Sequence, residues 1–464
     1  MNPTQVVSEL ICALGSTRVL VGADVPARHH ADWSGVLPVA PMALVSPQST
    51  EEVAVALRIC HSHGQAVAVQ GGLTGLAGAA APLVGEVAIS LEHLAGIQEV
   101  DQNSATLTAW AGTPLEVIQN AAEAAGFHCG IDLGARGSCT IGGNVATNAG
   151  GTQVLRYGMA RENVLGLEVV LADGTVLPML NKMMKNNTGY DIKQLFIGSE
   201  GTLGVITRVV LALHPKPREV QCAMVEVKDF DAALDVLRRA GSVLGTSLLS
   251  FEAMWPGFRR FAAKTMNMSM PLNGEQGLWL LLDAEARSPH QGESLFEEFL
   301  ANLYEDRIVT QAVVAQSLQE RKRLWSLREA PSEFPRLMPG HIGFDVSIPL
   351  GAMTRATQEI ESALVNSWPD VTALFYGHVA DSNLHLVVHV PSAGHQPKKE
   401  ILDMVYGIVN EHRGAISAEH GIGMLKKAWL GLSRSESELS LMKTVKISLD
   451  ARNILNPGRI FDLT

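Results

Sequence analysis

Residues 134–151 read GARGSCTIGGNVATNAGG, and the interpretation of the whole chain starts from this stretch. Glycine and short polar residues dominate it, and only Ile141 and Val145 offer sizeable apolar side chains. A helix or strand of the core would carry more bulk, so we expect a loop. Without a Cβ in the way, backbone N–H groups can approach a flat or anionic ligand closely. The stretch therefore predicts a ligand-binding loop.

Two further glycine-rich stretches lie in the same half of the chain, QGGLTGLAG at 70–78 and GSEGTLG at 198–204. Three such loops favour a large phosphate-bearing cofactor over a single phosphate. The stretch at 70–78 follows an apolar strand, but its glycine spacing is not that of the Rossmann fingerprint. The chain also has no Walker lysine–serine pair after a glycine loop. A nicotinamide site and a nucleoside triphosphatase are therefore poorly supported.

Composition narrows the class of protein. The chain has 464 residues, a formal net charge of −11, 47% hydrophobic residues and 18% charged residues. This is the composition of a well-packed soluble protein of two or three domains. The negative charge argues against nucleic acid, because binding phosphate backbones needs clustered Lys and Arg. No apolar run is long enough to span a bilayer, and residues 1–10 lack the basic region of a secretory signal.

The cysteines are odd in number and scattered, and no C-x-x-C pair occurs among Cys12, Cys60, Cys129, Cys139 and Cys222. An iron–sulfur cluster or a disulfide framework is therefore not expected. A reducing environment fits this pattern, and we expect a cytoplasmic location.

Hydrophobic periodicity divides the chain into three parts. Up to residue 217, strands and helices alternate, with a capped helix from Ser49 and a hairpin over 164–177 that turns at Asp173-Gly174. The segment HPKP at 214–217 is a plausible linker. We expect a cofactor-binding domain over 1–217, a second domain of strands and helices over 218–428, and a C-terminal segment over 429–464 that returns to the first domain. A helix is predicted over 435–449.

A histidine-rich stretch, YGHVADSNLHLVVHV at 376–390, indicates a second kind of site. His378 and His385 would face opposite sides of one straight strand, but the turn-like residues 379–383 let them converge across a bend. SAEHGIG at 417–423 adds Glu419 and His420. Two histidines and one carboxylate with open positions suit a catalytic divalent metal, although incidental hairpin histidines are the plainer alternative. His389 is expected to be a solvated strand-end histidine rather than a further ligand.

The order of these motifs resembles the FAD-linked oxidases of the vanillyl-alcohol-oxidase superfamily. The resemblance rests on residues 70–75, 132–151, NTGYD at 187–191 and FIGSEGTLGVI at 196–206. It implies an α+β fold, in which a PCMH-type FAD-binding domain of two α/β subdomains is joined to an α+β substrate domain with an antiparallel sheet. Some relatives attach FAD to a histidine in the first loop. This loop has none, so non-covalent FAD is expected.

By the same resemblance, residues 70–75 would hold the pyrophosphate, residues between 138 and 151 would line the isoalloxazine and ribityl chain, and Ile206 would lie near the adenine. Leu73 stands where close relatives often have Asn. The full set of expected FAD-binding residues is Gln70, Gly71, Gly72, Leu73, Thr74, Gly75, Leu76, Asp132, Gly134, Ser138, Gly142, Gly143, Asn144, Thr147, Gly151, Glu200, Gly204, Ile206 and Asn456.

The motifs G-H-x-x-D-x-N-x-H and E-H-G-x-G are similar to those of the D-2-hydroxyacid dehydrogenase branch, whose members include D-2-hydroxyglutarate and D-lactate dehydrogenases. This implies His378, His385 and Glu419 as ligands of a divalent metal, Zn²⁺ above all, with Mn²⁺ or Co²⁺ as alternatives. The metal would chelate the carboxylate and the 2-hydroxyl of the substrate, and a hydride would pass from C2 to flavin N5. His420 would be the catalytic base and also touch the substrate, together with Arg328, Ser332 and Val387.

Substrate identity stays open among D-lactate, D-mandelate, other monocarboxylic D-2-hydroxyacids, D-2-hydroxyglutarate and D-malate. Relatives specific for D-2-hydroxyglutarate typically have a lysine near Gly343 and an asparagine at Val387. This chain has neither, and Val387 shares a strand face with His385, which favours a less charged substrate side chain. Arg336 or His341 could replace the missing lysine.

Two other functions remain alternatives. A non-catalytic flavin-binding electron-transfer subunit of a larger oxidase would keep the glycine loops but would not need the His/Glu cluster. A nicotinamide-dependent flavin reductase is disfavoured by the lack of a dinucleotide signature. We expect an electron-transfer flavoprotein or a quinone as electron acceptor, no nucleic acid, no transmembrane segment and, as an open possibility, a homodimer.

Overall fold

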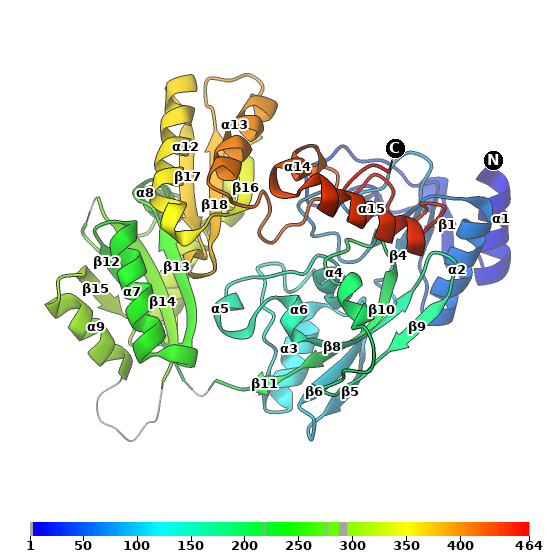
Figure 1. The fold of residues 1–464 in the computed structure, drawn as a ribbon, viewed down its shortest axis with the longest axis horizontal. Helices are drawn as coiled ribbons and strands as arrows, with labels where there is room; N and C mark the ends of the chain where they lie inside the picture. The colour runs from blue at the N-terminus through cyan, green and yellow to red at the C-terminus, as the bar shows by residue number, and fades with distance from the viewer. Residues whose placement is uncertain (1–2, 218, 275, 287–294, 464) are drawn as a thin grey trace. The chain divides into compact units, whose positions relative to one another are not determined.

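The computed structural model describes residues 3–217, 219–274, 276–286 and 295–463 (Figure 1). They form two compact units. The first comprises residues 1–151, 157–216 and 419–464, and the second comprises residues 152–156 and 217–418. One boundary thus lies inside the predicted linker, whereas the other precedes the expected domain end at residue 428. Among the described residues, no helix has the length and hydrophobicity needed to cross a membrane.

The first sheet of the first unit carries the glycine-rich stretch at 70–78 between two of its strands. Its strand order is β1 (Val19–Val21), β2 (Ala43–Val45), β4 (Val87–Ser90) and β3 (Val67–Gln70), and all pairs except β1 with β2 are parallel. Helix α1 (Pro3–Leu14) packs on α2 (Thr50–His63). As predicted, α2 begins after Ser49, whose side chain accepts the Glu52 N–H. The carboxyl end of β3 leads directly into residues 71–78.

The second sheet of this unit is antiparallel, with the order β5-β6-β10-β8-β9. Strands β8 and β9 form the predicted hairpin around Gly174, whose φ is 84°. The sheet packs against α3 and α4 in one buried apolar cluster. The bounds of these elements are β5 (Ile97–Asp101), β6 (Thr106–Trp110), α3 (Leu115–Ala124), β7 (Phe127–His128), α4 (Ile141–Ala146), α6 (Ala160–Asn163), β8 (Val164–Val170), β9 (Val176–Met179), β10 (Val205–Ala212) and β11 (His214–Pro215).

The expectation of an uninterrupted loop over residues 134–151 is wrong, because Ile141–Ala146 form the short helix α4. Ile141 and Val145 are fully buried and anchor it. Glycine is required here for close packing, since a Cβ on Gly142 would lie 2.5 Å from the Cβ of Ala111. The glycines therefore allow a helix to approach the neighbouring strand, in addition to freeing backbone groups for a ligand.

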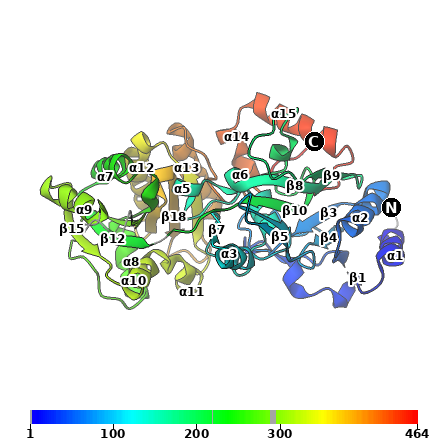
Figure 2. The ribbon, with the colours of Figure 1, turned by 90° about the horizontal axis from the view of Figure 1, so that it is seen from below.

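The second unit is built on one seven-stranded antiparallel sheet with the order β15-β12-β14-β13-β17-β18-β16. Helices α7, α12 and α13 lie on one face and α8, α10 and α11 on the other (Figure 2). The strands are β12 (Val220–Val227), β13 (Leu248–Met254), β14 (Leu278–Glu285), β15 (Val309–Val314), β16 (Ile342–Ser347), β17 (Thr372–Gly377) and β18 (Asn383–His389). The helices are α7 (Phe230–Val243), α8 (Pro256–Thr265), α9 (Leu295–Glu305), α10 (Leu318–Arg328), α11 (Phe334–Leu337), α12 (Met353–Ser367) and α13 (Lys398–Glu411).

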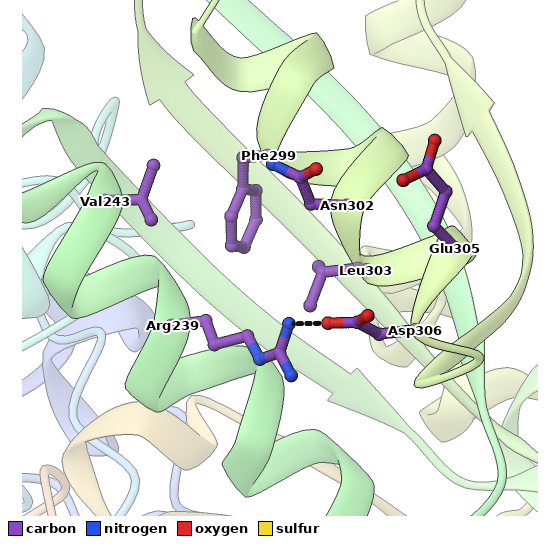
Figure 3. A pocket seen from close by; sticks show the side chains of 7 residues that line it. All are labelled: Arg239, Val243, Phe299, Asn302, Leu303, Glu305 and Asp306. Atoms are coloured by element: carbon purple, nitrogen blue, oxygen red, sulfur yellow. Dashed lines mark hydrogen bonds and ion pairs between the residues drawn. The ribbon is translucent and has the colours of Figure 1, made fainter.

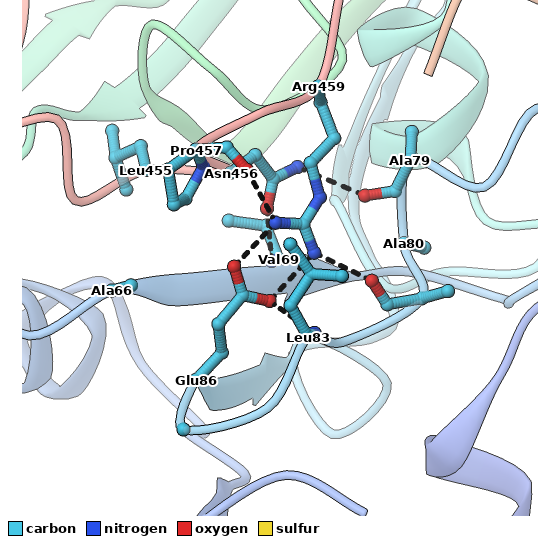
Figure 4. A network of polar contacts seen from close by, with 12 residues as sticks. Ala66, Val69, Ala79, Ala80, Leu83, Glu86, Leu455, Asn456, Pro457 and Arg459 are labelled. Atoms are coloured by element: carbon cyan, nitrogen blue, oxygen red, sulfur yellow. Dashed lines mark hydrogen bonds and ion pairs between the residues drawn. The ribbon is translucent and has the colours of Figure 1, made fainter. Parts of the chain in front are cut away.

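The C-terminal segment completes the first unit, through α14 (Leu430–Ser433), α15 (Glu436–Leu449) and the residues after them. Helix α15 begins with a capping box between Ser435 and Glu438, as expected for a helix starting at this point. Beyond it, the buried Arg459 guanidinium forms a bidentate pair with Glu86, at 2.5 and 2.7 Å (Figure 4). Arg459 also donates to the carbonyl of Ala81. This buried charge pair fixes the end of the chain to the first sheet.

Replacing Arg459 by alanine is expected to lower the free energy of unfolding by about 3–5 kcal/mol, because Glu86 would be left as a buried charge without its partner. Urea denaturation followed by circular dichroism measures the change. Arg434→Ala is the matched control, since Arg434 and Glu438 form a half-exposed ion pair, and it should change the free energy of unfolding little. Equal effects of the two substitutions would contradict a dominant role for the buried pair.

Candidate active site

The hairpin of β17 and β18 brings the two predicted histidine ligands together, within the second unit. His378 follows the last residue of β17, and His385 lies on β18 opposite Tyr376. The residues between them form a short 3₁₀ turn that ends at Ser382, with φ 71°. The ring centroids of the two histidines are 5.3 Å apart, and nitrogen atoms of the two rings lie within 4.8 Å of each other. The predicted convergence across a bend is confirmed.

A buried carboxylate that the sequence analysis missed, Glu252 on β13, contacts both His378 and Arg328. Its Oε1 lies 2.5 Å from His378 Nδ1, and its Oε2 accepts from Arg328 Nε at 2.7 Å. Burial acts to raise the pKa of Glu252, but the charges of His378 and Arg328 outweigh it and lower the pKa to about 2. An ionised Glu252 accepts a hydrogen bond from His378 Nδ1, and in the neutral form of the ring this leaves the lone pair on Nε2. This is the usual arrangement of a metal-binding histidine held by a carboxylate.

His385 has an acidic neighbour as well. Asp345 is buried on β16, directly opposite His385, and its Oδ1 lies 3.9 Å from His385 Nδ1. The side chain of Asn383 donates to the same oxygen at 3.3 Å. Both histidines therefore have a buried carboxylate on the Nδ1 side, which favours Nε2 of each ring as the ligand atom.

Arg328, predicted to contact the substrate, ends α10 and is buried beside these groups. Its guanidinium stacks over the ring of Tyr376, with its central carbon 4.7 Å from the ring centroid, and Nη2 lies 3.5 Å from His378 Nε2. Of the five N–H donors of a guanidinium, the one on Nε is bound to Glu252. Ser332, the other predicted substrate contact on this segment, instead donates to the carbonyl of Glu329 at 3.0 Å.

Val387 and Gly343 lie opposite each other on β18 and β16 and share the sheet face of His385. Val387 is buried in an apolar cluster that includes Leu374, Phe334 and Met338. A Cβ added at Gly343 would have no described atom within 4 Å. The strand face next to His385 is therefore apolar on one side and open on the other.

The residues considered as replacements for a missing lysine are already engaged. Arg336 pairs with Glu333 at 2.8 Å, and its side chain is 68% exposed. His341 Nδ1 lies 3.0 Å from the carbonyl of Met338, to which it donates. His389 is half-buried rather than solvated, and its Nδ1 is buried without a hydrogen-bond partner among the described residues. Burial lowers the pKa of His389. As expected, this histidine ends β18, and it is in neither group of possible metal ligands among the described residues, although it is less solvated than expected.

In the first unit, the glycine-rich stretches 70–78 and 134–151 contact each other. A Cβ on Gly72 would lie 2.1 Å from the carbonyl oxygen of Ser138, and a Cβ on Gly71 would lie 2.6 Å from Thr140 Oγ1. Thr140 Oγ1 is buried and has no hydrogen-bond partner within the described part of the chain. Two glycine-rich loops with an unsatisfied hydroxyl between them fit a polar ligand such as the phosphates or the ribityl chain of FAD. Leu73 adopts φ 59°, a conformation in which Asn is more common.

All the residues predicted to bind FAD belong to this unit, but several of their side chains serve to shape the loops. The side chain of Gln70 donates to the backbone carbonyl of His29. The side chain of Asn456 accepts the N–H of Val69 and donates to the carbonyl of Glu200. Gly204 packs on Val169. The side chains with contacts inside their own segment are Asp132 (with Arg136), Asn144 (with Cys139) and Thr147 (with Gly143). Ile206 is buried in β10.

Glu419 and His420 begin the C-terminal part of the first unit and lie in a loop. Glu419 Oε1 accepts the N–H of Gly151 at 2.7 Å, so the loop is bound to the end of the 134–151 stretch. Both carboxylate oxygens of Glu200 accept backbone N–H groups of the same loop, from Ile422 and Gly423. A carboxylate and an imidazole are thus adjacent in one loop of the first unit.

A separate pocket of about 240 Å³ lies between α7 and α9 of the second unit (Figure 3). It is lined by Arg239, Val243, Phe299, Asn302, Leu303, Glu305 and Asp306. Arg239 and Asp306 form an ion pair across it. None of the predicted site residues lines this pocket, and it has no part in the chemistry considered below.

Comparisons with known proteins show the family to which the chain belongs. Residues 216–460 match the C-terminal domain of FAD linked oxidases, and residues 41–179 match an FAD binding domain. The chain is 38% identical to mitochondrial D-2-hydroxyglutarate dehydrogenase of Bos taurus, over 96% of this chain and 81% of that protein. It is 34% identical to a putative mitochondrial D-lactate dehydrogenase of Schizosaccharomyces pombe, over 94% and 84%. The structure of p-cresol methylhydroxylase with substrate bound has the same fold, with a TM-score of 0.80 at 16% identity, over 99% and 97%.

Proposed function

Because the chain belongs to the family of FAD-linked oxidases, we propose that it is a metal-assisted dehydrogenase that oxidises a D-2-hydroxyacid to the 2-oxoacid. FAD-dependent oxidation is the common property of this family, and relatives named for D-2-hydroxyglutarate and for D-lactate extend over nearly the whole chain. The observation that carries the metal-assisted part is the contact of the Glu252 carboxylate with His378 Nδ1. It prepares His378 Nε2 as a metal ligand.

We assign His378, His385 and Glu419 as the residues that would hold the metal. Imidazole nitrogen with carboxylate oxygen suits Zn²⁺, and also Mn²⁺ or Co²⁺. When bound, FAD would supply the two-electron acceptor and the metal a Lewis acid for the oxygens of the substrate. The described geometry of His378 and His385 fits this donor set.

The side chains of the protein then have separate tasks. His420 takes the proton of the 2-hydroxyl group as general base, a contribution of roughly 10²–10⁴-fold. Arg328 binds the substrate carboxylate through the part of its guanidinium that is turned away from Glu252. Glu252 keeps both Arg328 and His378 in place and neutralises part of the positive charge that a metal ion and an arginine bring together.

For the substrate we propose a D-2-hydroxyacid with one carboxylate. Val387 lies in an apolar cluster on the face of His385, and Gly343 opposite it contributes no side chain. Arg336 is paired with Glu333. A second carboxylate packed against Val387 would lose water without gaining a cation, which is unfavourable.

The acceptor of the electrons, an electron-transfer flavoprotein or a quinone, stays a prediction, as do the homodimer and the cytoplasmic location. A non-catalytic electron-transfer subunit is the second candidate. It would have no use for Glu252, His378 and Arg328 in one buried hydrogen-bonded group. Turnover of D-2-hydroxyacids with an artificial electron-accepting dye, absent with L-enantiomers, distinguishes the two functions.

The FAD is expected to be bound without a covalent link. Residues 70–78 contain no histidine, so purified protein should be yellow and should release intact FAD into the supernatant on acid or heat denaturation. Absorbance and mass of the released flavin provide the measurement. Flavin that precipitates with the polypeptide would contradict this expectation, and protein that stays colourless after incubation with FAD would contradict the proposed function.

A further inference from the structure

Glu200 has an unusual backbone conformation in the middle of the third glycine-rich stretch. Its φ is 52°, in the left-handed region that side-chain-bearing residues seldom adopt. Two hydrogen bonds hold it there. Its N–H donates to the carbonyl of Ala146 in α4 at 2.7 Å, and its own carbonyl accepts from Asn456 Nδ2 at 2.7 Å. Such a conformation persists where the surroundings fix it, and it turns the side chain of Glu200 inward.

The carboxylate of Glu200 is buried, and both of its oxygens accept hydrogen bonds from residues of the first unit. Oε1 accepts the N–H of Ile422 and Oε2 accepts the N–H of Gly423, both at 2.8 Å. Burial raises the pKa of Glu200, while the two amides and the positive charge of the buried Lys426 act in the opposite direction. Position 421 must remain glycine, because a Cβ there would lie 2.8 Å from Oε1 at a φ of 76°.

The loop that receives these two hydrogen bonds carries Glu419 and His420. Its other end is also held by the glycine-rich part of the unit, since Gly151 N–H donates to Glu419 Oε1 at 2.7 Å. These contacts join residues 419–423 to Gly151, which follows α4, and to Glu200, whose N–H donates to Ala146 of α4. Glycine at 421 and 423 gives the backbone of this loop wide conformational freedom, so contacts with other segments decide where the loop lies.

We propose that Glu200 is a positioning residue that fixes the 419–423 loop to α4, and so holds the base His420 and the metal ligand Glu419 in a constant relation to the FAD-binding loops. This inference rests on the proposed function for the roles of His420 and Glu419. Glu200, assigned above as an FAD contact by resemblance, would then act through the loop and not on the cofactor.

The test compares Glu200→Gln with a matched variant, Glu168→Gln. A glutamine has one acceptor oxygen and would turn its NH₂ group toward a backbone N–H, so one of the two hydrogen bonds to the loop is lost. Glu168 is a buried carboxylate of the same unit, bound by Thr50, Thr207 and Arg208 far from the loop in sequence. Both variants remove a buried negative charge, but only one of them touches the loop.

Hydrogen–deuterium exchange is the first readout. In Glu200→Gln, protection of at least one of the Ile422 and Gly423 amides should fall by at least about tenfold, because one of them loses its acceptor. Glu168→Gln should leave these amides protected. Equal protection in the wild type and in Glu200→Gln would overturn the proposal. This readout needs no substrate, so it can succeed even if hydroxyacid oxidation fails as the function.

Kinetics supply the second readout. Glu200→Gln should lower kcat by about 10- to 100-fold with flavin content retained, as expected for loss of a group that orients a site residue. In the background of His420→Ala the same substitution should have a smaller effect, because the part of its action that passes through His420 is already lost. A loss of kcat that is equal in Glu168→Gln, or that is undiminished in the His420→Ala background, would show a structural role only.

Discussion

His378→Ala is expected to lower kcat by about 10³-fold or more while FAD stays bound. The reason is that His378 lies in the second unit, whereas all predicted FAD contacts lie in the first. A Lewis acid contributes several kcal/mol to such a reaction, and each tenfold in rate corresponds to about 1.4 kcal/mol. Steady-state assays with a dye acceptor, together with metal analysis and the flavin spectrum, measure the effect. Chelation of the wild type should have the same result, and Zn²⁺, Mn²⁺ or Co²⁺ should reverse it.

Two further variants sharpen this experiment. His395→Ala removes an exposed histidine of the same unit and should leave metal content and kcat unchanged. Glu252→Gln keeps an oxygen that can accept from His378 Nδ1 but loses the charge, so metal affinity should fall by about 10- to 100-fold without loss of FAD. Wild-type protein that is fully active when free of metal would rule out the role given to His378, His385 and Glu419.

D-Lactate or D-mandelate should be oxidised with a kcat/KM at least comparable to that of D-2-hydroxyglutarate, and L-enantiomers should be poor substrates. Gly343→Lys should then raise the relative kcat/KM for D-2-hydroxyglutarate by about 10- to 100-fold, because an ammonium group would bind the second carboxylate. Gly343 suits this change, since it lies opposite Val387 and has open space around it. The comparison of kcat/KM across a panel of hydroxyacids measures the shift.

Gly241→Lys is the control, because it adds the same charge to an exposed position on α7, where a side chain also has open space. It should leave the order of substrates unchanged. Val387→Asn should move preference toward the diacid as well, at a cost in stability, since Val387 is buried among apolar side chains. A wild-type enzyme with a strong preference for D-2-hydroxyglutarate would show that another cation, such as His341, binds the second carboxylate.

Local sequence patterns predicted much of the fold and one half of the site. The cap at Ser49, the hairpin of β8 and β9, and the bend between His378 and His385 each depend on residues that are close in the chain. The order of the motifs was specific enough to indicate the family, which the domain matches confirm. Periodicity and turn residues carry this information because they reflect local backbone preferences.

The supporting carboxylates could not be predicted in the same way. Glu252 is separated from His378 by 126 positions, and Glu200 from Ile422 by 222. The only local signal is an acidic residue inside the largely apolar strand LLSFEAM at 248–254, which indicates a buried charge but not its partner. The helix α4 was missed for a related reason, because the glycine at 142 is explained by Ala111 on another segment.

The discontinuity of the first unit has a consequence for biosynthesis. Residues 419–463, which supply Glu419, His420, Asn456 and Arg459 to that unit, are translated only after the about 200 residues of the second unit. At usual elongation rates this delay is on the order of 10–40 s. During this time Glu86 and the amide of Val69 lack their partners from the C-terminal segment. The nascent chain should therefore bind FAD only after residues 419–463 have been synthesised, and a ribosome stalled near residue 418 should carry a flavin-free chain.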